Sequence, residues 1–229
     1  MNKEPYLVAM WTAILKFLEK ISVFYIVRNY ILPNYTAKNY RFVDNWLVFH
    51  TLLSILFVVI SYMDSVSIGV KYILVGYGSL RIFEIFIYQL NVLLVHPYQS
   101  TSYTLHSYRR MTIALIHNFF EIVFWFAGTY ITFQFINGID PGYAVYHSFT
   151  HMVTYSLDID SKQWPLLALI VLQGQALVGV FMTVISLARF ISLFPQPQST
   201  DSNEQHVDGF EYSELKKDLD EIKEHLKNQ

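Results

Sequence analysis

The apolar positions of this chain fall into long blocks separated by short polar stretches. Each block is about as long as, or longer than, the ~20 residues that an α-helix needs to cross the hydrocarbon core of a bilayer. The pattern therefore predicts an all-α integral membrane protein with four transmembrane helices per subunit. The blocks cover residues 46 to 63, 68 to 95, 111 to 135 and 164 to 193.

The N-terminal residues 5 to 32 also read as helix, ended by Pro33. Polar side chains recur there at helical spacing, namely Thr12, Lys16, Glu19 and Lys20. Three of them are charged, and each charge at the centre of a transmembrane helix costs roughly 2.5 to 3.5 kcal/mol. We expect an interfacial helix along the inner leaflet rather than a transmembrane helix or a signal peptide. A peripheral helix packed on its own protein is an equal alternative.

Charged residues also interrupt the second and third blocks. Arg81 and Glu84 are three residues apart, so they share a helix face and can pair. Glu121 lies at a comparable depth in the third block and can join them. Ionisable residues inside a membrane indicate function by default. The alternative is a structural cluster that fixes the packing of the two helices.

The stretch from Tyr143 to Phe194 has a different organisation. A short amphipathic segment at residues 146 to 152 precedes an irregular polar passage at 153 to 160 and then the last long apolar block. Non-helical backbone at membrane depth survives only where it is buried or lines water. The stretch therefore predicts a re-entrant pore loop between the last two transmembrane helices.

The residues of this stretch resemble a known family. Ser148-Phe149-Thr150 precede residues 151 to 159, and Gln175 to Phe181 follow in the last block, which ends near Arg189. This order resembles the pore module of the potassium-channel superfamily, over about residues 110 to 194. The resemblance implies an outer helix, a pore helix, a filter and an inner helix with a glycine hinge, repeated around a fourfold axis.

The filter letters depart from the family pattern T-V-G-Y-G-D. Placing Asp158 on the final aspartate puts Tyr155 and Leu157 at the two glycine positions. Both residues resist the backbone conformations that glycine enters freely. We expect a filter lined partly by the hydroxyls of Thr154 and Ser156 and ringed by Asp158 carboxylates. Such a ring favours monovalent cations, potassium or sodium, with weak selectivity and no cofactor. The expected filter residues are Val153, Thr154, Tyr155, Ser156, Leu157 and Asp158.

A second stretch reproduces the family letters more closely. Val75-Gly76-Tyr77-Gly78 lies inside the second apolar block. A filter there leaves little room for a pore helix, and close helix packing through glycine explains the same letters.

Several other residues near the pore stretch are candidates for function. His147 and His151 are four apart, and a titrating His151 is a candidate pH sensor, whereas a metal site lacks an evident third ligand. Asp140, Asp158 and Asp160 can concentrate cations at the outer mouth; for Asp140 and Asp160 the alternative is a solvated loop.

The last apolar block carries the candidate gate. Gly174 and Gly179 can let this helix bend, and Phe190 and Phe194 can form a hydrophobic constriction at its cytoplasmic end. The alternative is ordinary helix packing for the glycines and lipid contact for the phenylalanines.

After residue 194 the composition becomes polar over a linker at 195 to 209. The final segment, 210 to 229, has apolar residues spaced three and four apart, which predicts a parallel coiled coil; Leu at a with Ile at d favours a tetramer. A single amphipathic helix is the alternative. The heptad residues are Tyr212, Leu215, Leu219, Ile222 and Leu226.

Composition and charge narrow the remaining possibilities. The chain is 53% hydrophobic and 15% charged, with a net charge of -2, which disfavours a nucleic-acid partner. Six Lys or Arg residues near the ends of the apolar blocks fall on one side and two on the other, which places both termini in the cytoplasm of a plasma-membrane protein. No catalytic constellation stands out, so we do not expect an enzyme.

The predicted organisation is an N-terminal helix and link, two peripheral helices, a pore module, a linker and a coiled coil. Together these features predict a homotetrameric cation channel. The alternative is a non-conducting membrane scaffold or sensor whose coiled coil recruits a cytosolic partner. The boundaries are 1-45, 46-97, 98-194, 195-209 and 210-229.

Overall fold

The structure is a computed structural model of the 229-residue chain, and it describes residues 6–31, 40–94, 108–155, 165–193 and 223. The chain divides into two units, Met1–Phe190 and Ile191–Gln229. In the second unit the described residues are the last three of helix α9 and Lys223. The predicted linker and the coiled-coil residues Leu215, Leu219, Ile222 and Leu226 lie outside the described residues.

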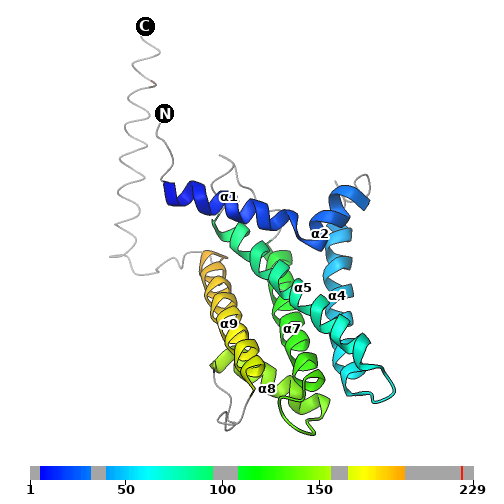
Figure 1. Ribbon diagram of the computed structural model, residues 1–229. Helices are drawn as coiled ribbons and strands as arrows, with labels where there is room; N and C mark the ends of the chain where they lie inside the picture. Colours follow the sequence, from blue (N-terminus) through cyan, green and yellow to red (C-terminus); the bar gives the residue numbers. More distant parts are fainter. Residues whose placement is uncertain (1–5, 32–39, 95–107, 156–164, 194–222, 224–229) are drawn as a thin grey trace. The chain divides into compact units, whose positions relative to one another are not determined.

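The described residues form helices and no strands, so the all-α prediction is confirmed for this part of the chain (Figure 1). Seven are α-helices and one, η1, is a π-helix. In chain order they are α1 (Tyr6–Lys20), α2 (Val23–Ile26), η1 (Val27–Ile31), α4 (Tyr40–Tyr62), α5 (Ile68–Leu94), α7 (Tyr108–Thr132), α8 (Pro141–Thr154) and α9 (Leu166–Leu193).

Three of the long helices are long and apolar enough to cross a membrane. They are Arg41–Tyr62 in α4, Arg109–Thr132 in α7 and Leu166–Ile185 in α9. Helix α5 has 27 residues but is not among these three helices, and it contains the charged residues Lys71, Arg81 and Glu84. The structure therefore supports three of the four expected transmembrane helices by length and composition.

Helix α7 is the central element of the first unit. It packs against α4, α5 and α8, and its residues from Glu121 to Thr132 are almost all buried. Trp125 and Ile122 belong to the main core cluster, which α9 extends with Leu172 and Met182. The other long helices therefore use α7 as their common surface.

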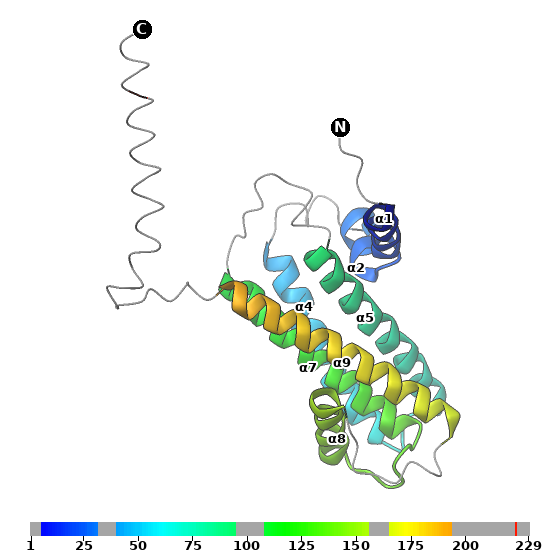
Figure 2. The ribbon, with the colours of Figure 1, turned by 90° about the vertical axis from the view of Figure 1, so that its left-hand side faces the viewer.

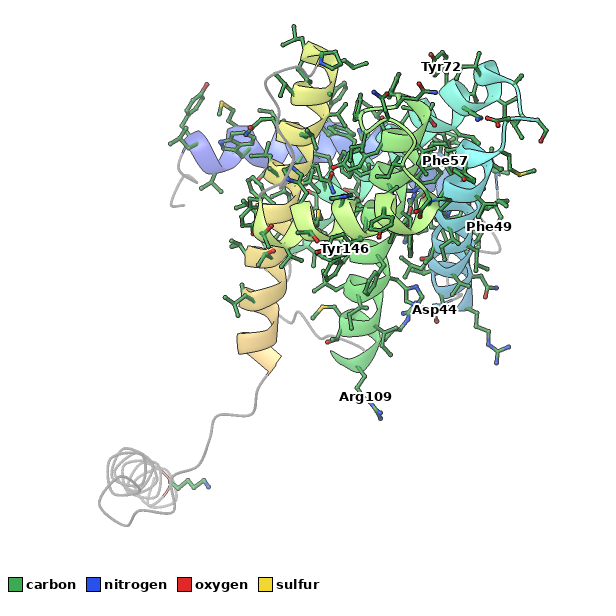
Figure 3. The ribbon with its side chains drawn as sticks, turned by 90° about the horizontal axis from the view of Figure 1, so that it is seen from below. Asp44, Phe49, Phe57, Tyr72, Arg109 and Tyr146 are labelled. Atoms are coloured by element: carbon green, nitrogen blue, oxygen red, sulfur yellow. The ribbon has the colours of Figure 1, made fainter. Side chains whose placement is uncertain are left out.

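Two glycines bring the helices close to α7. A Cβ atom added at Gly78 of α5 would lie 2.4 Å from the Trp125 ring, and one added at Gly128 of α7 would lie 2.4 Å from the Phe57 ring. Phe57 is 0% exposed in this contact, whereas Phe49 on the same helix is 59% exposed and lies on the outside (Figure 3). In both contacts, an aromatic ring occupies the space that a side chain at the glycine position would fill.

The Val75–Gly78 stretch lies in the middle of continuous helix α5. It provides no extended backbone, so the alternative filter at these residues is wrong. The packing explanation is confirmed for Gly78, whose neighbour is Trp125, whereas Gly76 has nothing within 4 Å of an added Cβ.

The N-terminal region departs from the expected single helix over residues 5 to 32. Helix α1 ends at Lys20, and the chain turns at Ile21 and Ser22 before α2 begins. The Ser22 side chain caps α2 by accepting a hydrogen bond from the Tyr25 N–H at 3.2 Å. Figures 1 and 2 show α1 running across the long helices rather than along them.

The boundaries of the first expected transmembrane helix also differ from the prediction. Helix α4 begins at Tyr40 rather than Trp46, so the expected boundary at 45/46 falls inside it. Asp64 and Ser65 lie in the turn between α4 and α5. Lys71, in the first turn of α5, is buried and donates to the Ser61 carbonyl at 2.8 Å, which satisfies a carbonyl in the last turn of α4.

We predict that Gly78→Ala destabilises the protein by about 1–3 kcal/mol, because the added methyl group overpacks the contact with Trp125. The measurement is thermal unfolding of the detergent-solubilised protein. Gly76→Ala, two residues away in the same helix, is the matched control and should preserve or raise stability, since alanine is the better helix former. Equal losses in both variants would contradict the packing role of Gly78.

Candidate functional site

Helix α8 is the half-length helix that the sequence predicts, although it is longer than residues 146 to 152. Its 14 residues span about 21 Å at 1.5 Å per residue, less than the ~30 Å of a hydrocarbon core. Asp140 is its N-cap and accepts hydrogen bonds from Gly142 N at 2.8 Å and Tyr143 N at 3.1 Å. The structure therefore shows Asp140 as the N-cap of α8.

Buried hydrogen bonds hold α8 between α7 and α9. The Ser148 hydroxyl donates to the Val123 carbonyl of α7 at 2.7 Å. Gln175 of α9 donates from Nε2 to the Ser148 carbonyl at 2.9 Å and approaches the Ser148 hydroxyl oxygen at 3.0 Å. Its Oε1 accepts the Tyr130 hydroxyl of α7. One glutamine thus ties together the three helices of the predicted pore module.

Helix α9 also rests directly on the backbone of α8. A Cβ atom added at Gly179 would lie 2.6 Å from the Met152 carbonyl oxygen and 3.3 Å from the Tyr155 ring. Gly174 has nothing within 4 Å of such an atom. Gly179 therefore serves close helix approach, while a bend at either glycine stays a prediction.

The two histidines of α8 have different surroundings. His151 is buried, and its Nε2–H donates to the Leu172 carbonyl of α9 at 3.0 Å. Its Nδ1 is buried and has no hydrogen-bond partner among the described residues. His147 is half-buried, with its ring edge-on to Tyr146 at 5.5 Å. The described residues contain no group of three or more His, Cys, Asp or Glu that could hold a metal.

The C-terminal end of α8 corrects the predicted start of the filter. Val153 and Thr154 belong to the helix, and the Thr154 hydroxyl donates to the Thr150 carbonyl at 2.7 Å. The irregular passage therefore does not begin at Val153. Tyr155 follows in the left-handed region at φ 57° and ψ 18°, a conformation that we expected a tyrosine to resist. Ser156, Leu157 and Asp158 lie outside the described residues.

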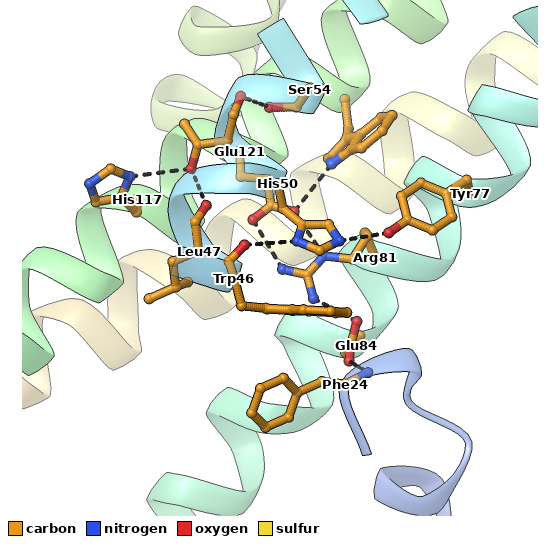
Figure 4. Close-up of polar contacts among 12 residues, drawn as sticks. Phe24, Trp46, Leu47, His50, Ser54, Tyr77, Arg81, Glu84, His117 and Glu121 are labelled. Carbon is orange, nitrogen blue, oxygen red and sulfur yellow. Dashed lines mark hydrogen bonds and ion pairs between the residues drawn. The ribbon is translucent and has the colours of Figure 1, made fainter. Parts of the chain in front are cut away.

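The second candidate site is a buried ion cluster between α5 and α7 (Figure 4). Arg81 makes two parallel bonds to Glu121, from Nε to Oε1 at 2.9 Å and from Nη2 to Oε2 at 3.1 Å. Its Nη1 pairs with Glu84 Oε2 at 2.6 Å. The predicted pairing of Arg81 with Glu84, and the inclusion of Glu121, are confirmed.

Further donors complete this cluster. Trp125 Nε1 donates to Glu121 at 3.3 Å, and Phe24 N donates to Glu84 Oε1 at 2.7 Å. The Ser22 hydroxyl donates to the same Glu84 oxygen. Charged groups are buried at low cost only when they are paired and hydrogen-bonded. The two carboxylates outnumber the one guanidinium, and the start of α2 supplies the additional donors.

A neutral polar network continues from this cluster into α4. His50 Nδ1 donates to the Trp46 carbonyl at 2.8 Å, and His50 Nε2 accepts from the Tyr77 hydroxyl at 2.6 Å. Thr51 lies 3.2 Å from His117 Nδ1 of α7. The Arg81 guanidinium lies 5.9 Å from the centre of the Trp46 ring. Sequence reasoning missed these residues, although His50 within an apolar block was a usable signal.

The predicted gate residues are only partly described. Phe190 lies in the last turns of α9, and Phe194 lies outside the described residues. Their role as a constriction stays a prediction.

The described residues thus define an all-α protein with three helices suited to cross a membrane and a short helix held between two of them. Comparisons with protein-family models, curated proteins and solved structures find no match to this chain.

We predict that Gln175→Leu lowers stability by about 1–3 kcal/mol, because it leaves the Tyr130 hydroxyl without its buried acceptor. Gln173→Leu is the matched control, since Gln173 is exposed on the same helix two residues away. Thermal unfolding in detergent measures both variants. Indistinguishable melting temperatures would show that Gln175 does not anchor α8.

We predict that Arg81→Met destabilises the protein by about 3–5 kcal/mol, because two buried carboxylates lose their counter-charge. The double variant Arg81→Met with Glu121→Met should recover part of this loss, because one of the orphaned carboxylates is gone. Arg109→Met, on the exposed first turn of α7, is the control and should change stability by less than about 0.5 kcal/mol. A double variant no more stable than Arg81→Met would contradict the pairing energetics.

Proposed function

We propose that this chain is one subunit of a homotetrameric cation channel of the plasma membrane, with a pore architecture like that of potassium channels and weak selectivity among monovalent cations. The observation that carries the proposal is helix α8, a half-length helix fixed between two helices that are long and apolar enough to cross a membrane.

The position of α8 supports a pathway that favours cations. A helix too short to span the hydrocarbon core leaves the following residues at membrane depth, where non-helical backbone must be buried or line water. The C-terminal end of a helix carries partial negative charge from its last carbonyl groups. The end of α8 at Thr154 therefore favours a cation beside residues 156 to 158.

The composition of the filter supports weak selectivity. The left-handed residue after α8 is Tyr155, so the chain reaches this conformation without glycine. In the proposal, Ser156, Leu157 and Asp158 continue the pathway, with carboxylate oxygens of Asp158 at its outer end. Rings of carboxylates attract cations in general and do not require one particular ion.

Helix α5 is the fourth transmembrane helix of the proposed channel. Its 27 residues correspond to about 40 Å, long enough to cross the core. Its two central charges, Arg81 and Glu84, are paired inside the protein, which lowers the cost of membrane burial. With four transmembrane helices, both termini lie on the same side of the membrane, and the excess of Lys and Arg near the helix ends on that side assigns it to the cytoplasm.

The remaining elements complete the proposed assembly. Gly174 and Gly179 allow α9 to bend, and Phe190 and Phe194 close the cytoplasmic end by a hydrophobic constriction. Residues 210 to 229 hold the tetramer together as a parallel coiled coil through Leu215, Leu219, Ile222 and Leu226.

We expect purified protein in planar bilayers to show unitary cation currents. Asp158→Asn should reduce the conductance, because it removes a ring of negative charge from the mouth of the pore. Asp64→Asn, in the turn between α4 and α5, is the control with the same charge change away from the pore. Reversal potentials in mixed potassium, sodium and chloride measure selectivity.

A folded tetramer that passes no current would contradict the channel proposal. A strong preference for potassium over sodium would contradict the proposed filter while leaving the channel itself intact.

A further inference from the structure

Within the described part of the chain, helix α1 leaves an apolar stripe uncovered. Leu7, Trp11 and Ile14 follow one another at spacings of four and three residues, so they share one helix face. Their exposed fractions are 64%, 54% and 38%. Lys16 and Lys20 are exposed on the opposite face. This division is typical of a helix that lies in the surface of a membrane.

A third face of α1 is attached to α5. Leu15 is buried against Ile87, and the Asn91 side chain donates to the Leu15 carbonyl at 3.5 Å. The helix runs across the end of α5 instead of along it (Figures 1 and 2). The protein therefore positions α1 without covering its apolar stripe.

The end of the protein that carries α1 is rich in basic residues. Phe24 of α2 packs on Trp46 in α4 at 5.6 Å, and Arg110 pairs with Asp44 at 2.8 Å, so the starts of α4 and α7 lie at this end. Arg109 projects beyond α7 there (Figure 3). The described charged residues from α1 to η1 and in the first two turns of α4 and α7 are Lys16, Lys20, Arg28, Arg41, Arg109 and Arg110 against Glu19 and Asp44.

The turn after α1 connects it to the buried ion cluster. Ser22 caps α2 and donates its hydroxyl to Glu84, and Phe24 N donates to the same carboxylate oxygen. A displacement of α1 therefore changes the donors of a carboxylate that also pairs with Arg81.

From these contacts we propose that α1 binds the surface of a bilayer containing anionic phospholipids, and that Ser22 transmits this binding to the Arg81–Glu84–Glu121 cluster. The apolar stripe inserts among the acyl chains nearest the headgroups. Lys16 and Lys20, with the neighbouring arginines, interact with the anionic headgroups. The partner is the lipid surface, because an exposed apolar stripe, a basic opposite face and adjoining membrane-crossing helices occur together.

The absence of cysteine from the chain permits a direct test. Ile14→Cys and Ala13→Cys are prepared in the full-length protein, labelled with an environment-sensitive fluorophore and reconstituted in vesicles of phosphatidylcholine with or without phosphatidylglycerol. Ala13 is the matched control, since it is exposed on a different face. Spin-labelled lipids should quench the label at position 14 more than the label at 13, and phosphatidylglycerol should increase this difference.

The lysines are tested in the Ile14→Cys background. Lys16→Gln with Lys20→Gln should remove the increase caused by phosphatidylglycerol, whereas Lys16→Arg with Lys20→Arg should retain it. Equal quenching at positions 13 and 14, as for a stripe covered by another protein or a second copy, would overturn the proposal. An increase that survives the glutamine variant would also overturn the role of the lysines.

The transmission step has its own measurement. Phosphatidylglycerol should raise the melting temperature of the wild-type protein by several degrees, since a ligand of the folded state stabilises it. Ser22→Ala should keep the quenching at position 14 but show a smaller rise, because the contribution that passes through the hydroxyl's bond to Glu84 is lost. A full rise in Ser22→Ala, or none in the wild type, would overturn the transmission. Neither readout uses ion flux, so a failure here is distinct from a failure of the channel proposal.

Discussion

A guanidinium group in the middle of a helical bundle can be buried only if it is paired with a neighbouring negative charge, and the packing of α5 on α7 depends on this requirement. Arg81 forms a bidentate ion pair with Glu121 and a further ion pair with Glu84. The geometry fixes both the rotation and the height of α5 against α7, because a planar fork accepts two carboxylate oxygens in only a narrow range of orientations. The same cluster then reaches α2 through Glu84 and Trp125 through Glu121.

The α7–α8–α9 part of the protein achieves a similar result with neutral groups. Gln175 has both a donor and an acceptor, so one side chain satisfies Tyr130 on α7 and Ser148 on α8. Neutral hydrogen bonds have a smaller desolvation cost than ion pairs, which suits a helix whose following residues are proposed to contact ions. The second half of α7 thus carries two kinds of attachment, ionic toward α5 through Glu121 and amide–hydroxyl toward α9 through Tyr130.

The spacing of residues in the sequence predicted those features that depend on residues close together in the chain. Arg81 and Glu84 were expected to pair because three residues make less than one helical turn, and the half-length helix was expected from the length of its apolar pattern. The anchors of α8 were not predicted, because Gln175 and its partners Ser148 and Tyr130 are 27 and 45 residues apart and their contact exists only after packing. The break at Ser22 was also missed, because its reason is a partner 62 residues away, Glu84. The sequence Val75–Gly78 matches the family's filter letters but is not a filter. Its glycine at position 78 is explained by contact with an aromatic ring rather than by ion binding.

The contact between Gly179 and the Met152 carbonyl has a mechanical consequence. No side chain separates the backbone of α9 from the last turn of α8 at this point. A tilt of α9 toward α8 therefore displaces that carbonyl. In the proposed channel, movement at the cytoplasmic end of α9 therefore reaches the ion pathway through backbone rather than through flexible side chains. In the proposed channel, bending of α9 at Gly179 then acts directly on the last turn of α8, so opening and ion selection are linked through this one backbone contact.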